Sequence, residues 1–193
     1  EQILNRYSEI NLSQWKLLEL GKLTREEVLV RRYEILFQEV GMSCDAKKIS
    51  EKYEDFLGEG HYFIPGAKEL LEDLSKKYHL YLASNGAVKV QMSRIQSAGI
   101  EKYLEKIFLS EQIGYEKPSP QFFEKCFAQI PDFKKEEALI LGDSLTSDIR
   151  GGKNAGILTV WFHPSGKKVE EEIVPDYEIG KLEELKTILS FYS

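Results

Sequence analysis

Two aspartates lie close together after an apolar run in the second half of the chain. The run spans 139–142, Asp143 follows it at once, and Asp148 comes about one and a half helical turns later. Such a run predicts a buried strand, and α/β proteins hold charged ligands at the carboxyl ends of their strands. Neighbouring carboxylates repel each other unless a cation neutralises them, and oxygen ligands suit Mg²⁺. The sequence therefore predicts a magnesium site at Asp143 and Asp148, with a plain helix cap at Ser147 or Asp148 as the alternative.

A second polar cluster, Ser84-Asn85-Gly86, follows the apolar run 80–83. A small hydroxyl, an amide side chain and a glycine at a strand-to-helix turn leave backbone N–H groups free to face an anion. We therefore expect Ser84, Asn85 and Gly86 to bind phosphate. The alternative is an ordinary tight turn, because Asn-Gly is common in turns of every kind.

The third cluster is a lysine in a stiff loop. Lys117 comes after the apolar run 107–109 and directly precedes Pro118, which restricts the loop and removes one backbone donor. A lone lysine of this kind usually faces solvent. Here, however, it is one of three polar clusters that each follow a separate strand, and parallel strands share one carboxyl edge. Phosphate donors, a lysine and two acids at one edge are the groups that phosphoryl transfer needs.

The elements that must position these clusters alternate in type from about residue 61. Strand-like runs occur at 79–83, 106–109, 138–142 and 157–162. Helical segments separate them, among them 88–98 and 122–130, and a last helix is expected at 181–189. This alternation predicts an α/β fold, with a Rossmann-like parallel sheet as its core and helices flanking both faces.

The first part of the chain, 1–58, has helical periodicity throughout and predicts a helical bundle. Thr24 and Glu27 have the spacing of a capping box. Gly41 is a natural helix end, and Asp45 is suited to cap a third helix. Four apolar residues of that third helix are expected to point inward: Ile49, Tyr53, Phe56 and Leu57.

Composition narrows the possible classes of protein. The 193 residues are 42% hydrophobic and carry a net charge of −6, from 26 basic and 32 acidic side chains. Scattered basic residues argue against a nucleic-acid partner, and no apolar run reaches the length of a membrane span. Cys44 and Cys126 stand alone and the histidines are far apart, which disfavours a zinc site or a disulfide framework. We expect a cytoplasmic protein without a membrane segment.

In order and spacing, the three clusters resemble motifs of the haloacid dehalogenase-like hydrolase superfamily. The family's second motif ends in Ser or Thr, as at Ser84. Its third motif is a lysine, commonly before proline, as at Lys117. Its fourth motif is Gly-Asp-x-x-x-x-Asp, as at Gly142, Asp143 and Asp148.

The resemblance covers the whole chain, with 1–58 as a helical cap and 59–193 as the α/β core. It implies a phosphoric monoester hydrolase that uses Mg²⁺ and small phosphate esters, with Lys117 as a catalytic and phosphate-binding residue. The segments Ser-Asn-Gly, Glu-Lys-Pro and Gly-Asp-Ser-Leu-Thr-Ser-Asp are most similar to the branch of pyrimidine 5′-nucleotidases. A nucleoside 5′-monophosphate is therefore the expected substrate.

The chain departs from the family pattern at one motif. In the family, Asp-x-Asp-x-Thr on the first strand supplies the nucleophile and the general acid/base, yet no Asp-x-Asp occurs in this sequence. That strand is central in the family's sheet, so its lack would leave a gap with unpaired backbone groups on both sides. We expect the nucleophile, which would form an aspartyl-phosphate, to lie upstream of these residues, and the 193 residues alone to be inactive.

Three other interpretations stay open. A sugar-phosphate phosphatase or a phosphomutase of the same family fits the same motifs, whereas the intact acids disfavour a dehalogenase. A non-catalytic phosphate-, metal- or partner-binding module, that is a degenerate phosphatase, fits the missing nucleophile. The sequence leaves the oligomeric state open.

Overall fold

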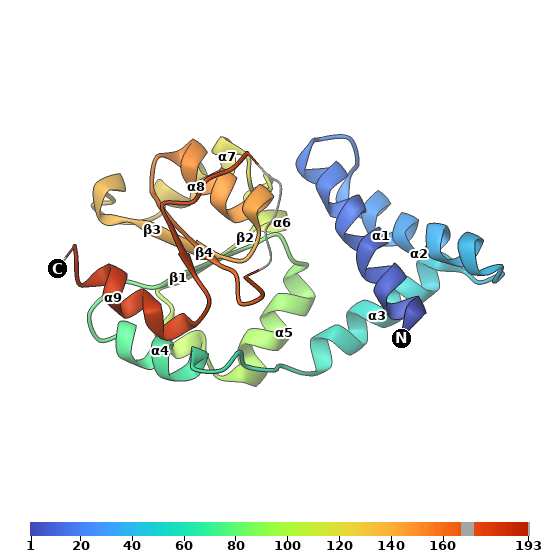
Figure 1. Ribbon diagram of the computed structural model, residues 1–193, viewed down its shortest axis with the longest axis horizontal. Coiled ribbons are helices and arrows are strands. Elements are labelled where there is room, and N and C mark those ends of the chain that lie inside the picture. Colours follow the sequence, from blue (N-terminus) through green and yellow to red (C-terminus); the bar gives the residue numbers. More distant parts are fainter. Residues whose placement is uncertain (167–171, 193) are drawn as a thin grey trace. The chain divides into compact units, whose positions relative to one another are not determined.

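A computed structural model describes residues 1–166 and 172–192 of the chain. The chain divides into Glu1–Gly60 and His61–Ser193, which we call the helical unit and the α/β unit (Figure 1). The division lies two residues beyond the boundary that the glycine-containing segment around residue 58 predicted. Within the described ranges, no helix is both long enough and apolar enough to cross a membrane.

The helical unit, described at every residue, consists of α1 (Gln2–Glu19), α2 (Arg25–Val40) and α3 (Ala46–Glu59). The capping box at the start of α2 is confirmed. The Glu27 amide donates to Thr24 Oγ1 at 3.3 Å, and the Thr24 amide donates to the Glu27 carboxylate at 2.7 Å. Gly41 ends α2 in the left-handed conformation, and Asp45 caps α3. Local hydrogen bonding therefore fixes these helix ends as the sequence predicted.

The expectation for the inner face of α3 holds only in part. Ile49, Tyr53, Phe56 and Leu57 are between 37% and 65% exposed. The buried positions of α3 are instead Ala46 and Ser50, four residues apart and therefore on one face of the helix. Tyr53, although 37% exposed, still contacts the neighbouring helices, since its ring lies 6.0 Å from that of Tyr7 and 6.2 Å from that of Tyr33.

A buried cation lies among aromatic rings in the helical unit. Arg32 is 4% exposed, and its guanidinium lies 5.1 Å from the Tyr33 ring and 5.2 Å from the Tyr53 ring. It also donates to the Asn11 side chain at 2.9 Å. The hydroxyls of Tyr7 and Tyr33 are 3.3 Å apart. Cation–π attraction and hydrogen bonds offset the cost of removing this charge from water.

The α/β unit alternates strands and helices as predicted. Its strands and α-helices, in chain order, are α4 (Ala67–Leu74), β1 (Tyr81–Ser84), α5 (Val88–Ala98), β2 (Lys106–Leu109), α6 (Ser110–Ile113), α7 (Pro120–Phe127), β3 (Leu139–Gly142), α8 (Arg150–Ala155), β4 (Leu158–Phe162), β5 (Tyr177–Ile179) and α9 (Leu185–Leu189). Its short helical turns are Glu101–Tyr103, Lys135–Glu137, Leu145–Ile149 and Leu182–Glu184. The four predicted strands are confirmed. β5 was not predicted, because its three residues contain a glutamate and form no apolar run.

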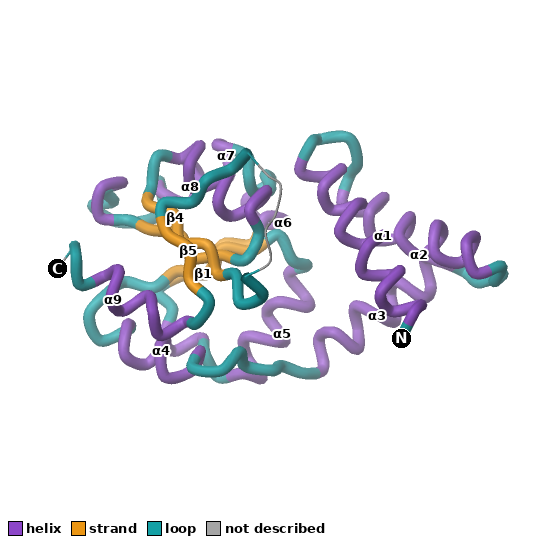
Figure 2. The backbone as a smooth tube through the Cα atoms, in the orientation of Figure 1, coloured by secondary structure: helices purple, strands orange, loops and turns teal. Residues whose placement is uncertain are grey.

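The strands form two parallel sheets, and no pairing joins the two sheets within the described residues (Figure 2). β1 pairs with β2, which sets Ser84 opposite Leu109. β4 lies between β3 and β5 and sets Gly142 opposite Trp161. Every residue of β1 and β3 is only half-buried, whereas four of the five residues of β4 are buried. One edge of β1 and one edge of β3 are therefore unpaired.

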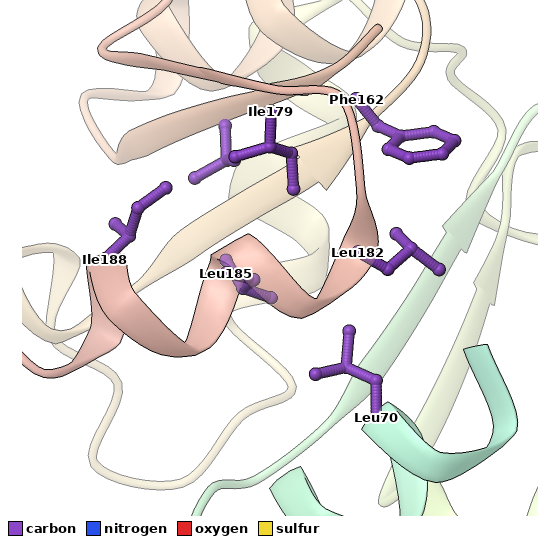
Figure 3. Packing of buried hydrophobic residues seen from close by; sticks show 7 residues of the cluster. Leu70, Phe162, Ile179, Leu182, Leu185 and Ile188 are labelled. Carbon is purple, nitrogen blue, oxygen red and sulfur yellow. The ribbon is translucent and has the colours of Figure 1, made fainter. Parts of the chain in front are cut away.

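Helices cover both faces of these strands (Figure 1). On one face α4 and α9 pack on β4 and β5, in a cluster made of Leu70, Val160, Phe162, Ile179, Leu182, Leu185 and Ile188. Figure 3 shows the Leu70 side chain of α4 directed toward Leu182, with Phe162 on the far side of Leu182. Burial of these side chains stabilises the unit by roughly 1.5–3 kcal/mol for each large apolar residue.

The opposite face joins the two sheets through one hydrophobic cluster. Phe122, Phe123 and Cys126 of α7 are buried there. Tyr81 of β1 and Ile140 of β3 pack against the same cluster. The two unpaired edges thus belong to one core, although no backbone hydrogen bond connects them.

Candidate functional site

The first predicted cluster forms a tight turn at the carboxyl end of β1. Ser84 Oγ accepts hydrogen bonds from the Gly86 amide at 3.0 Å and from Gln91 Nε2 at 3.1 Å. A Cβ on Gly86 would lie 2.3 Å from the Gln91 side chain, so that side chain in its present position leaves room only for a glycine. The serine hydroxyl and the backbone amides of this turn gather at the edge where phosphate binding was expected.

Asn85 has a role that the sequence did not reveal. Its Oδ1 accepts from the Lys117 amide at 2.9 Å, and its Nδ2 donates to the Lys117 carbonyl at 2.9 Å. A carboxamide carries a donor and an acceptor side by side, which matches the two backbone groups of one residue. The Asn85 side chain therefore holds the lysine loop against the turn after β1, and leaves only its backbone amide for an anion.

Lys117 links the two sheets at their carboxyl ends. Its ammonium donates to the Ala83 carbonyl of β1 at 2.7 Å and to Asp148 Oδ1 at 2.6 Å. Lys117 and Asp148 are each 7% exposed, so this ion pair is buried. The ordinary expectation of a solvent-facing lysine does not hold, because the loop turns the ammonium inward between the two strands.

Asp148 lies on the turn that follows β3, residues 143–149, whose wide helical part is Leu145–Ile149. The Ser144 carbonyl accepts from the amides of both Asp148 and Ile149, at 2.9 and 3.1 Å. The second of these bonds spans five residues, as in a π-helix, a widened turn that is frequent at functional sites. Asp148 Oδ2 in turn accepts from the Ser144 amide at 3.1 Å. Both oxygens of Asp148 are thereby engaged by protein groups.

Gly142 provides the space for this arrangement. A Cβ at this position would lie 2.3 Å from the Cβ, Cγ and Oδ2 of Asp148. No rotamer of a short buried side chain relieves a contact that includes its own Cβ. The glycine before Asp143 is therefore required by the second aspartate of the same motif.

Asp143 differs from Asp148 in its surroundings. Its side chain is exposed, and none of the described residues forms a hydrogen bond or ion pair with its carboxylate. Its backbone carbonyl accepts from Trp161 Nε1 at 2.9 Å. The turn thus offers one engaged carboxylate and one unengaged carboxylate.

This donor set fits Mg²⁺. Within 1–166 and 172–192, no group of three or more His, Cys, Asp or Glu side chains could hold a metal ion. Mg²⁺ does not need such a group, since it commonly binds one or two carboxylates and completes its shell with water and phosphate oxygens. Asp143 has the unengaged carboxylate for this purpose. Ligation by Asp148 stays a prediction, because Lys117 and Ser144 occupy its oxygens here.

The nearby thiol is not a nucleophile. Cys126 of α7 is buried in the cluster that joins the two sheets. Burial raises the pKa of this thiol to about 12, and the charge of Lys117 lowers the pKa only in part. The thiol is therefore protonated at neutral pH.

The structure brings most of the predicted site residues together. Asn85 contacts Lys117, Lys117 contacts Asp148, and Asp143 begins the turn that carries Asp148. Ser84 and Gly86 form the adjacent turn. Sequence reasoning missed Gln91, Ser144 and Trp161, whose contacts depend on side-chain directions that no motif spacing encodes.

Comparison with known proteins is consistent with this geometry. Residues 1–162 match the family model described as haloacid dehalogenase-like hydrolase. The chain is 42% identical over 185 residues to the HAD-hydrolase YfnB of Bacillus subtilis (strain 168), and this match covers 96% of this chain and 79% of YfnB. It is 37% identical over 180 residues to the pyrimidine 5′-nucleotidase PynA of Streptococcus pneumoniae (strain ATCC BAA-255 / R6), covering 93% of this chain and 76% of PynA.

A solved structure has the same fold. The crystal structure of YfnB from Bacillus subtilis, described as bound to magnesium and as revealing interdomain movement, superposes with a TM-score of 0.93. The two chains are 40% identical in sequence, and the match covers 98% of this chain and 83% of that one.

Proposed function

This chain belongs to the haloacid dehalogenase-like hydrolases, and on that premise we propose that it carries the site of a Mg²⁺-dependent phosphatase. The proposed reaction is hydrolysis of a small phosphate monoester, with a nucleoside 5′-monophosphate as the preferred substrate. The substrate is supported by the relatives named pyrimidine 5′-nucleotidase, among them PynA at 37% identity. A location in the cytoplasm stays a prediction from composition, and the oligomeric state stays open.

One observation carries the proposal. The ammonium of Lys117 lies between the Ala83 carbonyl of β1 and the carboxylate of Asp148, which follows β3. A buried ammonium fixed by two oxygens is a preorganised positive charge, and its remaining donor can face a phosphoryl oxygen. Such a charge costs no reorganisation when negative charge develops on the transferring group.

The remaining residues have complementary roles in this proposal. Ser84 Oγ and the backbone amides of Asn85 and Gly86 bind phosphoryl oxygens, after the Gly86 amide exchanges its present bond to Ser84 for the ligand. Asp143 holds Mg²⁺, with Asp148 behind it. The bound ion supplies positive charge that neutralises the phosphoryl oxygens. Asp148 also orients the Lys117 ammonium.

The proposed nucleophile is a carboxylate on a further parallel strand between β1 and β3. This is supported by the unpaired edges of those two strands and by their incomplete burial. The carboxylate oxygen attacks phosphorus, the ester P–O bond breaks, and a general acid protonates the departing alcohol. Water then attacks phosphorus while the deprotonated general acid takes its proton, and the bond between phosphorus and the aspartate oxygen breaks, which releases inorganic phosphate and restores the carboxylate. No Asp-x-Asp segment of the 193 residues can supply this group.

A substrate panel tests the proposal on a protein that contains this chain. Pyrimidine and purine nucleoside 5′-monophosphates and several sugar phosphates are incubated with Mg²⁺ or with EDTA, and phosphate release is measured. We expect fastest release from a pyrimidine nucleotide and loss of release with EDTA. Lys117→Ala should lower kcat by at least about a hundredfold. The matched control is Lys134→Ala, an exposed lysine paired with Glu137, which should keep full activity.

The second candidate is a module that binds phosphate without turnover. It is favoured by the absence of Asp-x-Asp from the sequence. Titration of inorganic phosphate and Mg²⁺ by calorimetry separates it from the phosphatase. Binding that depends on Lys117, together with no phosphate release from any ester in the panel, would replace the proposed hydrolysis by this function. Full activity of Lys117→Ala would contradict both candidates.

A further inference from the structure

The Trp161 side chain supports the turn that carries both aspartates. Its indole N–H donates to the Asp143 carbonyl at 2.9 Å. Its ring, 8% exposed, packs with Leu145 and Ile149 in a separate hydrophobic cluster. One side chain from β4 therefore contacts the turn both at its first residue and on its apolar side.

A second ring fixes the indole from another direction. The His163 ring stacks on Trp161 with centroids 3.9 Å apart and an interplanar angle of 16°. Both nitrogens of this histidine are engaged: Nδ1 lies 2.8 Å from Glu178 Oε1, and Nε2 lies 2.7 Å from Ser165 Oγ. His163 directly follows β4, two residues after Trp161, and its amide still donates to the Ile179 carbonyl of β5, so the two side chains lie on the same side. Glu178 lies opposite Trp161 on β5 and therefore orients the histidine on that same face.

This support matters for Asp143 in particular. No described residue engages the Asp143 carboxylate, so the direction of this side chain depends on its backbone. The backbone leaves β3 at this residue and enters the wide turn. A hydrogen bond to the Asp143 carbonyl restrains rotation of that peptide group. Partners of this kind commonly change metal affinity by 10- to 100-fold, by orienting a ligand that they do not replace.

We propose that Trp161 is a positioning residue that aims the Asp143 carboxylate at a divalent cation, with the oriented His163 ring as its backing. The cation in this statement rests on the proposed function. The restraint on the turn does not, since it follows from the contacts of Trp161 alone. The two parts can therefore be tested separately.

The test compares two identical substitutions in a protein that contains this chain. Trp161→Phe removes the N–H donor and keeps an aromatic ring. The matched control, Trp15→Phe, removes an indole N–H bond to Asn11 in the helical unit. Amide hydrogen exchange over 144–149 reports the turn, because several of these amides donate within it. Binding of Mn²⁺, followed by the EPR signal of the free ion, reports the cation site.

We expect Trp161→Phe to speed exchange over 144–149 and to weaken Mn²⁺ binding, each by about tenfold. Trp15→Phe should change neither. Unchanged exchange in Trp161→Phe overturns the positioning role. Faster exchange with unchanged Mn²⁺ affinity overturns the link to the cation. If the wild type itself binds no Mn²⁺, the metal site of the proposed function fails, while faster exchange in Trp161→Phe still supports the restraint on the turn.

A second variant guards against loss of folding. His163→Ala leaves the indole and its N–H in place and removes only the stacked ring. It should give smaller changes of the same sign in both measurements, whereas His163→Phe should restore the wild-type values. If Trp161→Phe does not fold, the comparison of His163→Ala with His163→Phe tests the positioning role instead. Equal behaviour of His163→Ala and His163→Phe then overturns the proposal.

Discussion

The two units of this protein bury charge in different ways. In the helical unit, Arg32 has no carboxylate partner among the described residues, and aromatic rings with one amide oxygen compensate it. In the α/β unit, Lys117 is paired with the Asp148 carboxylate after β3 and also donates to the Ala83 carbonyl of β1. The first arrangement is fixed mainly by helices that are neighbours along the chain. The second exists only when distant strands have assembled, so its loss should disturb the unit far more.

The largest effect is expected when this buried pair is broken. Lys117→Met leaves the Asp148 carboxylate buried without a cation, which should lower the free energy of unfolding of the α/β unit by about 3–5 kcal/mol. Urea unfolding followed by Trp161 fluorescence in a Trp15→Phe background measures it. Lys134→Met breaks an exposed pair with Glu137 and should leave the stability almost unchanged. Equal costs for both variants would remove the distinction between buried and exposed pairs.

The second effect concerns the glycine that makes room for Asp148. Gly142→Ala places a Cβ 2.3 Å from Asp148 atoms, so it should cost about 2–3 kcal/mol through overpacking. Gly180→Ala is the matched control, because no atom lies within 4 Å of its added Cβ. Thermal and urea unfolding of both variants test the contrast. A stable Gly142→Ala protein would mean that the Asp148 turn can shift without cost.

A smaller effect is expected in the helical unit. Thr24→Ala removes the hydroxyl that accepts from the Glu27 amide, which should destabilise the unit by about 1 kcal/mol. Thr24→Ser keeps a hydroxyl and should restore most of the stability. Fluorescence of Trp15 in a Trp161→Phe background reports this unit separately. A Thr24→Ala protein as stable as wild type would show that tertiary packing, and not the cap, fixes the start of α2.

The smallest effect depends on pH. Burial, followed by the hydrogen bond to Tyr33, raises the pKa of Tyr7 well above its ordinary value. Below about pH 10 both the folded and unfolded states keep this proton, so the group does not alter stability. Above that pH the unfolded chain loses the proton first, so the helical unit loses stability as pH rises.

Tyr7→Phe should reduce this alkaline loss. Urea unfolding of the helical unit at neutral pH and near pH 10.5 would measure it, and Tyr62→Phe, at a residue 94% exposed, is the control. An unchanged pH dependence in Tyr7→Phe would show that Tyr7 ionises in the folded state.

Local signals account for what the sequence predicted well. The capping box at Thr24, the glycine at 41 and the strand ends, at 109 and 142 as predicted and at 84 where 83 was predicted, all depend on residues adjacent in the chain. The inner face of α3 could be predicted only in part, since burial of Ala46 and Ser50 depends on which neighbour the helix meets. Residue types alone identified the polar clusters of the site.

The contacts within the site could not be predicted from the sequence. Asn85 and Gly86 have the same turn signal, yet the Asn85 side chain binds Lys117 across a separation of 32 residues. In the sequence, Trp161 counts only as an apolar residue of a predicted strand. Its indole N–H reaches the Asp143 carbonyl only because β3 and β4 pair in one register. Non-local pairing decides these roles, and a single sequence taken by itself carries no record of it.

The unpaired edges of β1 and β3 also bear on handling the protein. Exposed strand edges are templates for any extended peptide, so material limited to these residues should be prone to self-association. The same property makes complementation practical. A short synthetic peptide with strand-forming sequence and an Asp-x-Asp segment could be titrated into the chain, and recovered solubility would report its insertion. Insertion of such a peptide between the two unpaired edges could then serve as the basis of a split reporter, in which two separate polypeptides give a signal only when they bind each other.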